Sequence, residues 1–287
     1  AGRRPDRHGP GRGGVSPGPR APEYRRARRS LGQNFLVDPN LQRRIVDAVG
    51  AGPDDEVLEI GPGRGALTLH LEGRVGRLVL VELDDDLAAH WAATFADRPE
   101  VEVVHGDILE VDLADLSRDP SSLRVVGNIP YNITTPILFR LLEQPRPARI
   151  VLMVQKEVGE RIVAEPGTGA YGALAVGVRS VADARLLFAV SRKAFRPVPG
   201  VDSVVLEIVP HVPPRLDPRD EADLRRLTRA AFQWRRKQMQ KTLRDHPDLD
   251  LDRARVAAVG QSLGLDLRRR PETLSPDDLL ALARAIR

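Results

Sequence analysis

The stretch VLEIGPGRG, residues 57–65, decides the fold of this sequence. A short apolar run leads directly into a turn with glycines at three alternate positions. Continuous apolar runs of this kind are typical of parallel strands that helices cover on both faces. In an open α/β sheet, ligands bind beyond the carboxyl ends of such strands, where glycines let the backbone turn tightly and approach the ligand. The stretch therefore predicts an α/β fold with a ligand site at this turn.

The sequence around this stretch repeats the alternation of strands and helices. A helix is predicted from Pro39, with Asp38 as its N-cap and Gly50 at its end, and further helical patterns occupy residues 84–96 and 134–143. Buried strands separated by helices indicate an open sheet with a largely parallel core. The other apolar runs predict strands at residues 78–81, 101–104, 125–126 and 150–154.

The chain of 287 residues has the length of one large domain plus a small one. Residues 184–190 and 201–209 predict an antiparallel hairpin at the edge of the sheet. The composition turns Pro-rich and polar at residues 210–218, and the pattern beyond is helical. We therefore predict a disordered basic arm at residues 1–29, an α/β domain at residues 30–212 and a helical domain at residues 213–287.

Composition limits the kinds of protein that the chain can be. The net charge of +4 is uneven, since residues 1–30 carry +7 and the remainder carries −3. The chain has no cysteine, which excludes disulfides, thiolate zinc sites and cysteine nucleophiles. No apolar run approaches the roughly 18–20 residues that span a bilayer, and no apolar core follows the basic N-terminus as in a secretory signal. We expect a cytoplasmic protein that does not bind membranes.

Two acidic residues at later strand ends favour a nucleoside-type cofactor. Glu82 ends the second predicted strand, and its carboxylate can accept both hydroxyl protons of a ribose. Asp107 follows the third strand and can accept a hydrogen bond from an adenine amino group. Together with the backbone of Gly61 and Gly63, these side chains predict a cofactor site at the carboxyl edge of the sheet.

The motif Asn128-Ile129-Pro130-Tyr131 ends the fourth strand and is the most specific short signal in the chain, because it resembles the N-[LI]-P-Y motif of amino-group methyltransferases. An exocyclic adenine amine is a poor nucleophile, because its lone pair is delocalised into the ring. The Asn128 side-chain oxygen and the Pro130 carbonyl can hold its protons and aim the lone pair at a methyl group. Tyr131 offers a face on which an extruded base can stack. This chemistry requires no metal and no covalent intermediate.

From Ser30 to the C-terminus the sequence resembles the family of rRNA adenine N6-methyltransferases, and most closely its KsgA type. The resemblance rests on the G-x-G-x-G turn and on the stretches SLGQNFL (30–36), NIPYNITTP (128–136), YGAL (171–174) and AFRPVP (194–199). It implies a Rossmann-like class I S-adenosylmethionine-dependent methyltransferase domain followed by a small all-helical domain. In the family, the cofactor pocket is lined at the positions of Asn34, Leu36, Gly61, Glu82, Asp107 and Asn128.

The resemblance also implies the substrate and one further site residue. By analogy, Phe195 stacks on the target adenine opposite Tyr131. The implied reaction is dimethylation of two adjacent adenosines in 16S rRNA of the small ribosomal subunit, carried out by a monomer. The chain departs from the pattern at Gly200, where a Lys is expected, and in its long basic arm, but neither touches the predicted chemistry.

A basic segment in the helical domain predicts the RNA-binding surface. Residues 225–244 contain eight basic and no acidic residues. Such a run repels itself unless an anionic partner is present, although many charged helix faces are merely solvated. The residues that we expect to contact RNA phosphates are Arg225, Arg229, Arg235, Arg236, Lys237 and Lys241.

Three other functions remain open from the sequence. An Erm-like enzyme would share the chemistry but modify 23S rRNA and confer antibiotic resistance; residues 270–278 (RPETLSPDD) favour the KsgA type. A ribosome-assembly or transcription factor would keep the fold and lose turnover, which the intact 128–131 motif argues against. A nicotinamide-dependent oxidoreductase would need the G-x-G-x-x-G spacing, which this turn lacks.

Overall fold

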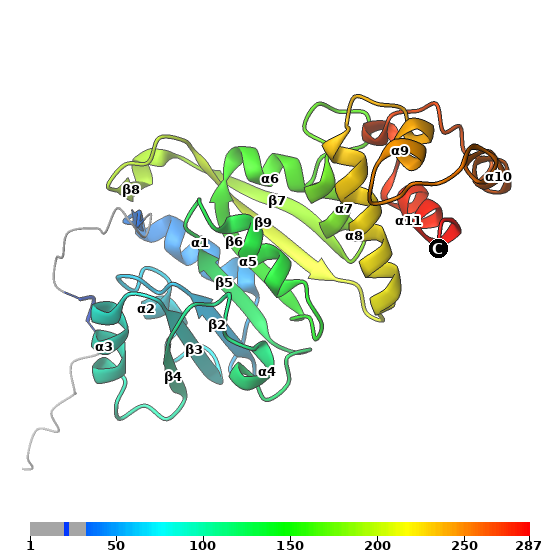
Figure 1. Ribbon diagram of the computed structural model, residues 1–287. Coiled ribbons are helices and arrows are strands. Elements are labelled where there is room, and N and C mark those ends of the chain that lie inside the picture. The colour runs from blue at the N-terminus through cyan, green and yellow to red at the C-terminus, as the bar shows by residue number, and fades with distance from the viewer. Residues whose placement is uncertain (1–19, 23–32) are drawn as a thin grey trace, which may run out of the picture.

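The computed structural model describes residues 20–22 and 33–287, and a seven-stranded sheet forms its centre (Figure 1). Its order is β4-β3-β2-β5-β6-β9-β7, in which the first five strands are parallel and β9 is antiparallel to both its neighbours. This confirms the predicted α/β fold and the antiparallel edge hairpin. The strands are β2 (Glu56–Ile60), β3 (Arg77–Glu82), β4 (Val101–His105), β5 (Arg124–Asn128), β6 (Arg149–Gln155), β7 (Ala182–Val190) and β9 (Ser203–Pro210).

Helices cover both faces of the sheet and create two separate apolar cores. One core packs α1, α2 and α3 against the sheet, and the other packs α4, α5, α6 and α7 against the opposite face. Because both faces are covered, the central strands are apolar on both sides, as their continuous apolar runs predicted. The helices are α1 (Pro39–Val49), α2 (Thr68–Leu71), α3 (Asp85–Thr94), α4 (Leu113–Leu116), α5 (Thr134–Leu141), α6 (Lys156–Ile162) and α7 (Ala173–Arg179).

Helix α1 shows how local sequence sets the helix ends. The Asp38 carboxylate accepts hydrogen bonds from the N–H groups of Asn40 and Leu41, and Pro39 occupies the first turn. Gly50 ends the helix in the left-handed conformation, with φ of 63°. Both caps confirm the predicted start and end of this helix.

The order of the strands places the candidate site. The chain passes from β2 to β3 on one side, whereas β5 lies on the other side of β2. The loops that follow β2 and β5 therefore diverge, and ligands bind at such a topological switch point. Gly65, in the first of these loops, has φ of 82°, and a Cβ there would lie 2.5 Å from Cη2 of Trp91. The predicted glycine turn is thus required by both backbone conformation and packing.

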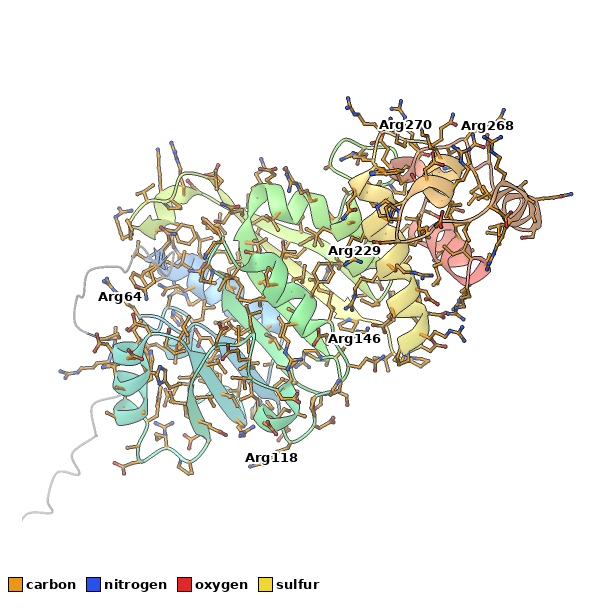
Figure 2. All side chains as sticks on the ribbon, in the orientation of Figure 1. Arg64, Arg118, Arg146, Arg229, Arg268 and Arg270 are labelled. Carbon is orange, nitrogen blue, oxygen red and sulfur yellow. The ribbon has the colours of Figure 1, made fainter. Side chains whose placement is uncertain are left out.

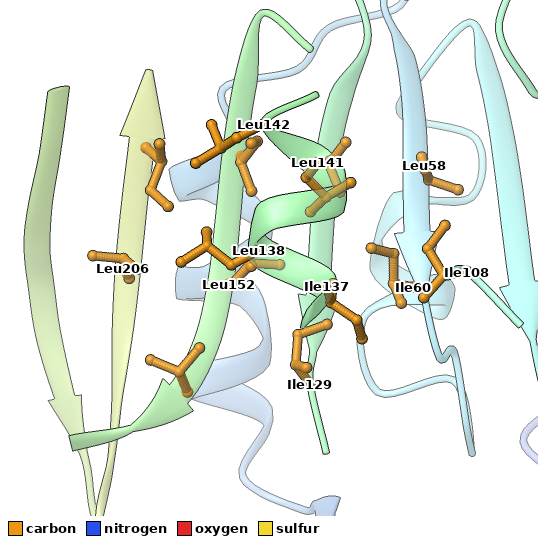
Figure 3. Close-up of a cluster of buried hydrophobic side chains, with 14 of the residues drawn as sticks. Leu58, Ile60, Ile108, Ile129, Ile137, Leu138, Leu141, Leu142, Leu152 and Leu206 are labelled. Carbon is orange, nitrogen blue, oxygen red and sulfur yellow. The ribbon is translucent and has the colours of Figure 1, made fainter. Parts of the chain in front are cut away.

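Helix α5 joins this loop region to the core. Figure 3 shows its side chains Ile137, Leu138 and Leu141 over the strands that carry Leu58 and Leu152. All five are buried, with at most 1% of their surface exposed. The helix that follows the candidate catalytic loop is therefore held firmly on the sheet.

The C-terminal part is helical, as predicted, but it shares a core with the α/β part. Tyr171 and Ala175 pack in one apolar cluster with Leu224 and Leu279, and the Tyr171 hydroxyl donates to the Leu274 carbonyl over 2.8 Å. The division at residues 212–213 falls between β9 and α8, and as a domain boundary it stays a prediction. The helices are α8 (Pro218–Gln233), α9 (Met239–Asp245), α10 (Arg253–Leu263) and α11 (Pro276–Ala285).

Two short strands complete the fold: β1 (Phe35–Leu36) pairs antiparallel with β8 (Phe195–Arg196). The arm predicted at residues 1–29, except residues 20–22, lies outside the described part of the chain, as do Ser30, Leu31 and Gly32. In the described part, every helix is too short or too polar to cross a bilayer.

Replacement of Leu138 by Ala should lower the free energy of unfolding by about 2–5 kcal/mol, because it leaves a cavity under α5. Urea unfolding followed by circular dichroism measures this loss. Val212→Ala is the matched control, since that side chain is 87% exposed and its loss should change stability by no more than about 0.5 kcal/mol. Equal stability of the two variants would contradict the core that we describe.

Candidate active site

A cavity of about 300 Å³ lies beyond the carboxyl ends of β2, β3 and β5. The segment at residues 33–36 forms its wall on the side of β1. The cavity thus stands where the strand order predicts a ligand site. It brings together nine of the ten predicted cofactor and catalytic residues: Asn34, Leu36, Gly61, Gly63, Glu82, Asp107, Asn128, Pro130 and Tyr131.

The glycine turn and Glu82 form one rigid corner of the cavity. The N–H of Gly63 donates to Oε2 of Glu82 over 2.9 Å, and the N–H of Asp84 donates to Oε1 over 3.0 Å. Each carboxylate oxygen keeps a second acceptor position. Burial raises the pKa of Glu82, while these backbone hydrogen bonds oppose the rise. Gly61 has φ of 65°, and no atom lies within 4 Å of the place where a Cβ would stand, so its backbone faces open space.

Asp107 lies in the cavity wall and is held by its own loop. Its Oδ1 accepts the N–H of Leu109 over 2.9 Å. The apolar side chains Leu83 and Ile108 line the same part of the cavity, and Leu83 is 45% exposed although it directly follows a buried strand. Neither was predicted. The signal in the sequence was an apolar residue directly after each of the strand-end acids Glu82 and Asp107.

Asn128 is oriented by the N-terminal segment. Its Nδ2 donates to the carbonyl of Asn34 over 2.9 Å. One N–H of the carboxamide is therefore used within the protein, and the side-chain oxygen can accept a hydrogen bond from a ligand. The structure brings Asn34 and Asn128, which are 94 residues apart, into one hydrogen-bonded pair.

The Pro130 carbonyl is less free than the sequence suggested. It accepts the N–H of Ile133 over 3.2 Å and the hydroxyl of Thr134 over 3.3 Å. Both hydrogen bonds are long, and the Thr134 hydroxyl can rotate about its Cβ–Oγ bond. A ligand amine must therefore displace the Thr134 hydroxyl to reach this carbonyl.

Tyr131 is half-buried at the cavity and fixed at its far end. Its hydroxyl lies 2.7 Å from Oγ of Ser203, the first residue of β9. Burial raises the pKa of the Tyr131 phenol, so the ring stays neutral at physiological pH. The hydrogen bond to Ser203 limits the rotation of the ring and so sets the plane that it presents to the cavity.

Phe195 is the predicted site residue that the structure does not bring to the cavity. It pairs with Leu36 between β1 and β8 and is completely buried in the core with Ala194 and Val205. Stacking of Phe195 on a base is therefore incompatible with this conformation, because core packing covers its ring. Phe35, its neighbour in the same pair of strands, lines the cavity instead, and the Arg64 guanidinium lies 4.2 Å from its ring centroid.

The predicted RNA-binding residues divide into two groups. Arg235 pairs with Glu272 over 2.6 Å and donates to the Gly169 carbonyl over 2.9 Å, so this guanidinium holds the fold together. Arg229 lies 3.4 Å from Asp248. The expectation that the basic residues of 225–244 lack acidic partners was therefore incomplete, because Asp248 and Glu272, which lie outside this segment, pair with two of them. The other four lie on α8, after it or on α9, and all four are exposed: Arg225, Arg236, Lys237 and Lys241.

Glu59 is a buried acid at the floor of the cavity. Only 2% of its surface is exposed, and the Thr68 hydroxyl donates to its Oε2 over 2.7 Å. Burial raises the pKa of Glu59 to about 8, and the negative charge of Glu82 adds to the rise. The side chain is therefore a neutral acid at physiological pH, with one O–H donor beside the glycine turn.

The chain is similar in sequence to known RNA-modifying proteins. The family model described as ribosomal RNA adenine dimethylase matches residues 24–262. "Ribosomal RNA small subunit methyltransferase A" of Geobacter metallireducens is 47% identical over 264 residues, which cover 91% of this chain and 96% of that protein. The protein of the same name from Moorella thermoacetica is 41% identical and covers 90% of this chain, with 92% of its own length matched.

Solved structures show the same fold. A dimethyladenosine transferase from Plasmodium falciparum superposes with a TM-score of 0.75 at 24% identity, covering 86% of this chain and 95% of that chain. The 23S rRNA methyltransferase ErmE superposes with a TM-score of 0.66 at 28% identity, covering 88% of this chain and 99% of its own.

The raised pKa of Glu59 predicts a pH dependence of stability. Between about pH 4.5 and pH 8 the unfolded chain has released this proton while the folded chain still holds it. The free energy of unfolding should therefore fall as pH rises through this window, by up to about 1.4 kcal/mol per pH unit from this group. Glu59→Gln should remove that slope in urea unfolding at a series of pH values, with Glu160→Gln on α6 as the exposed control. An unchanged slope in Glu59→Gln would contradict a neutral Glu59.

Proposed function

The chain belongs to the family of ribosomal RNA adenine dimethylases, and from this membership we propose how its cavity carries out the reaction. The protein is a methyltransferase that transfers methyl groups from S-adenosylmethionine to N6 of adenine in ribosomal RNA. The observation that carries this assignment is the carboxamide of Asn128, whose donor end is bound to Asn34 while its acceptor oxygen is left for an amine. We propose two adjacent adenosines near the 3′ end of 16S rRNA as the substrate, because the two relatives described above are both named small-subunit methyltransferases.

The residues of the cavity fit S-adenosylmethionine, which supplies an activated methyl group on its sulfonium sulfur. Glu82 has acceptor positions for the ribose hydroxyls, and Asp107 can accept from the adenine amino group. Leu83 and Ile108 lie where they can pack against the two faces of the adenine ring. The open backbone at Gly61 allows close approach of the cofactor's amino-acid part.

The catalytic loop prepares the target amine. The Asn128 oxygen and the Pro130 carbonyl each accept a hydrogen bond from one N–H of the amine, which favours a tetrahedral nitrogen whose lone pair points away from both acceptors. The Thr134 hydroxyl gives up its long hydrogen bond to Pro130 when the amine arrives. Tyr131, held by Ser203, supplies the surface on which the flipped base stacks. Positioning and electrostatics supply the rate enhancement, and no covalent bond to the protein is needed.

Basic residues of the helical part supply affinity for the RNA backbone. We propose that Arg225, Arg236, Lys237 and Lys241 contact phosphates, with a smaller part for Arg229, and that Arg235 acts mainly within the fold. Such contacts fix the register of the RNA, while stacking and shape select the base. A monomeric state and a cytoplasmic location also remain our predictions.

The function is tested by methyl transfer to purified RNA substrates. Radiolabelled S-adenosylmethionine is supplied with unmethylated small ribosomal subunits and, in parallel, with naked 23S rRNA, and the labelled nucleoside is identified. N6,N6-dimethyladenosine in the small-subunit sample alone is expected. Label confined to 23S rRNA would instead assign the protein to the Erm-like enzymes, and no label in either sample would favour a non-enzymatic assembly factor.

Asn128→Ala should abolish methyl transfer, by about 100-fold or more, because the amine loses an acceptor that aims its lone pair. Calorimetry with S-adenosylmethionine should still detect binding, since we propose that the cofactor is held mainly by residues at the carboxyl ends of β2, β3 and β4. Asn40→Ala, at the exposed start of α1, is the matched control and should retain activity. Turnover of the Asn128 variant close to that of the unmodified protein would exclude the proposed role.

Glu82→Ala should weaken the affinity for S-adenosylmethionine by about 10- to 100-fold, because it removes the acceptors proposed for the ribose hydroxyls. Isothermal calorimetry measures the change. Since Glu82 also accepts two backbone N–H groups, thermal unfolding of the same variant must show that the fold persists. An affinity equal to that of the exposed control Glu160→Ala would rule out the ribose contact.

A further inference from the structure

A second cavity, of about 400 Å³, lies where α5 and α7 of the α/β part face α8 of the helical part. We propose that it binds a second, unstacked nucleotide of the RNA substrate, distinct from the adenine that receives the methyl group. This inference rests on the proposed function, since it takes ribosomal RNA as the ligand. Its volume is in the range of pockets that hold small organic ligands.

One face of α8 forms a wall of this cavity. Leu224, Thr228 and Phe232 are spaced by four residues, so they stand above one another on the helix. Arg225 and Arg229 form the neighbouring row, also four residues apart, and line the same cavity from its exposed edge. The helix therefore presents an apolar interior and a cationic rim to one ligand.

Two aromatic rings lie on different walls of the cavity. Phe139 of α5 is 37% exposed, and its ring rests on Gly177 of α7, where a Cβ would come within 2.8 Å of Cε1. Phe232 of α8 is supported from behind by Tyr171, with ring centroids 6.0 Å apart at 70°. Supported rings with an open face are suited to stacking on a planar base.

An unsatisfied hydroxyl points to a polar edge on the ligand. Thr228 is only 5% exposed, and its hydroxyl has no hydrogen-bond partner within the described structure. A buried polar group without a partner is costly, and native proteins rarely keep one unless another molecule completes it. A nucleobase, with donors and acceptors on its edge, supplies such a partner, whereas a purely apolar side chain does not.

The charges at the rim favour a nucleotide over a peptide of low charge. Arg225 forms no ion pair with any residue that the structure describes, and Arg229 is 65% exposed at its side chain. At the inner end, Arg146 and Glu221 neutralise each other over 2.6 Å. Figure 2 shows Arg146 and Arg229 beside α8, on the far side of the α/β part from Arg64 at the cofactor cavity. Because Asp248 lies 3.4 Å from Arg229, the positive charge that remains at the outer edge is mainly that of Arg225, where the phosphate attached to an inserted base would lie.

Helix α5 connects this cavity to the catalytic loop. Thr134, at its first turn, contacts the Pro130 carbonyl, and Phe139 lies five residues further on, about 7.5 Å along the helix axis. A nucleotide held at Phe139 is therefore held at a fixed separation from the amine acceptors. It would set the position of the RNA relative to the methyl donor.

Two variants test the second nucleotide site. Phe139→Ala removes a stacking surface, and Thr228→Val keeps the volume but removes the hydroxyl. Each variant should bind unmethylated small ribosomal subunits more weakly, by about 10-fold for Phe139→Ala. Each should also have a raised KM for the subunits and an unchanged affinity for S-adenosylmethionine. Thr228→Val should not lower Tm, since its hydroxyl has no partner in the free protein. Thr94→Val on α3 is the matched control and should bind subunits normally.

Cross-linking identifies the occupant. A photoreactive phenylalanine analogue placed at residue 139 should cross-link to a single rRNA nucleotide, which primer extension locates. Cross-linking only to a ribosomal protein would overturn this proposal and leave the proposed function standing. The same holds if both variants show unchanged KM and unchanged affinity for subunits that the unmodified protein methylates. Failure of the unmodified protein to methylate subunits would instead overturn the proposed function, and this inference with it.

Discussion

The divergence of the chain at the carboxyl ends of β2 and β5 is the constraint on which the site depends. Because β3 lies on one side of β2 and β5 on the other, the loops that follow β2 and β5 leave a gap between them. The glycine turn after β2 and the Asn128–Tyr131 loop after β5 form its two walls. The hydrogen bond from Asn128 to Asn34 then ties the N-terminal segment over the same gap. The position of the cavity is therefore a consequence of strand order, and the side chains that line it determine which ligand and reaction it supports.

Two acids with different environments stand in this cavity. Glu82 receives two backbone N–H groups, which favour its charged form, whereas Glu59 lies deeper and has the Thr68 hydroxyl. Burial is the main reason why Glu59 keeps its proton, and the charge on Glu82 makes its ionisation harder still. Glu82 thus offers carboxylate acceptors to the cofactor position, and the neighbouring Glu59 can act as a hydrogen-bond donor.

Much of this arrangement could be predicted from sequence, because it depends on contacts that are local along the chain. Strand ends, the glycine turn and the caps of α1 each follow from a few adjacent residues. The exceptions depend on partners distant in sequence. The packing of Phe195 beneath β1 and the pairing of Arg235 with Glu272 arise only when remote segments meet. The weakest expectations were therefore the stacking by Phe195 and the uncompensated charge of residues 225–244. Leu83 and Ile108 were missed for another reason, because an apolar residue beside an acid carries little signal alone.

The apolar cluster shared by Tyr171 with α8 and α11 has a consequence for how such proteins evolve. Its side chains come from both parts of the chain, and neither part can cover them without the other. A gene fragment that encodes only residues 30–212 would leave apolar surface exposed to water and to other chains. Exchange of the helical part for an unrelated module would therefore require its replacement to reproduce the same buried surface.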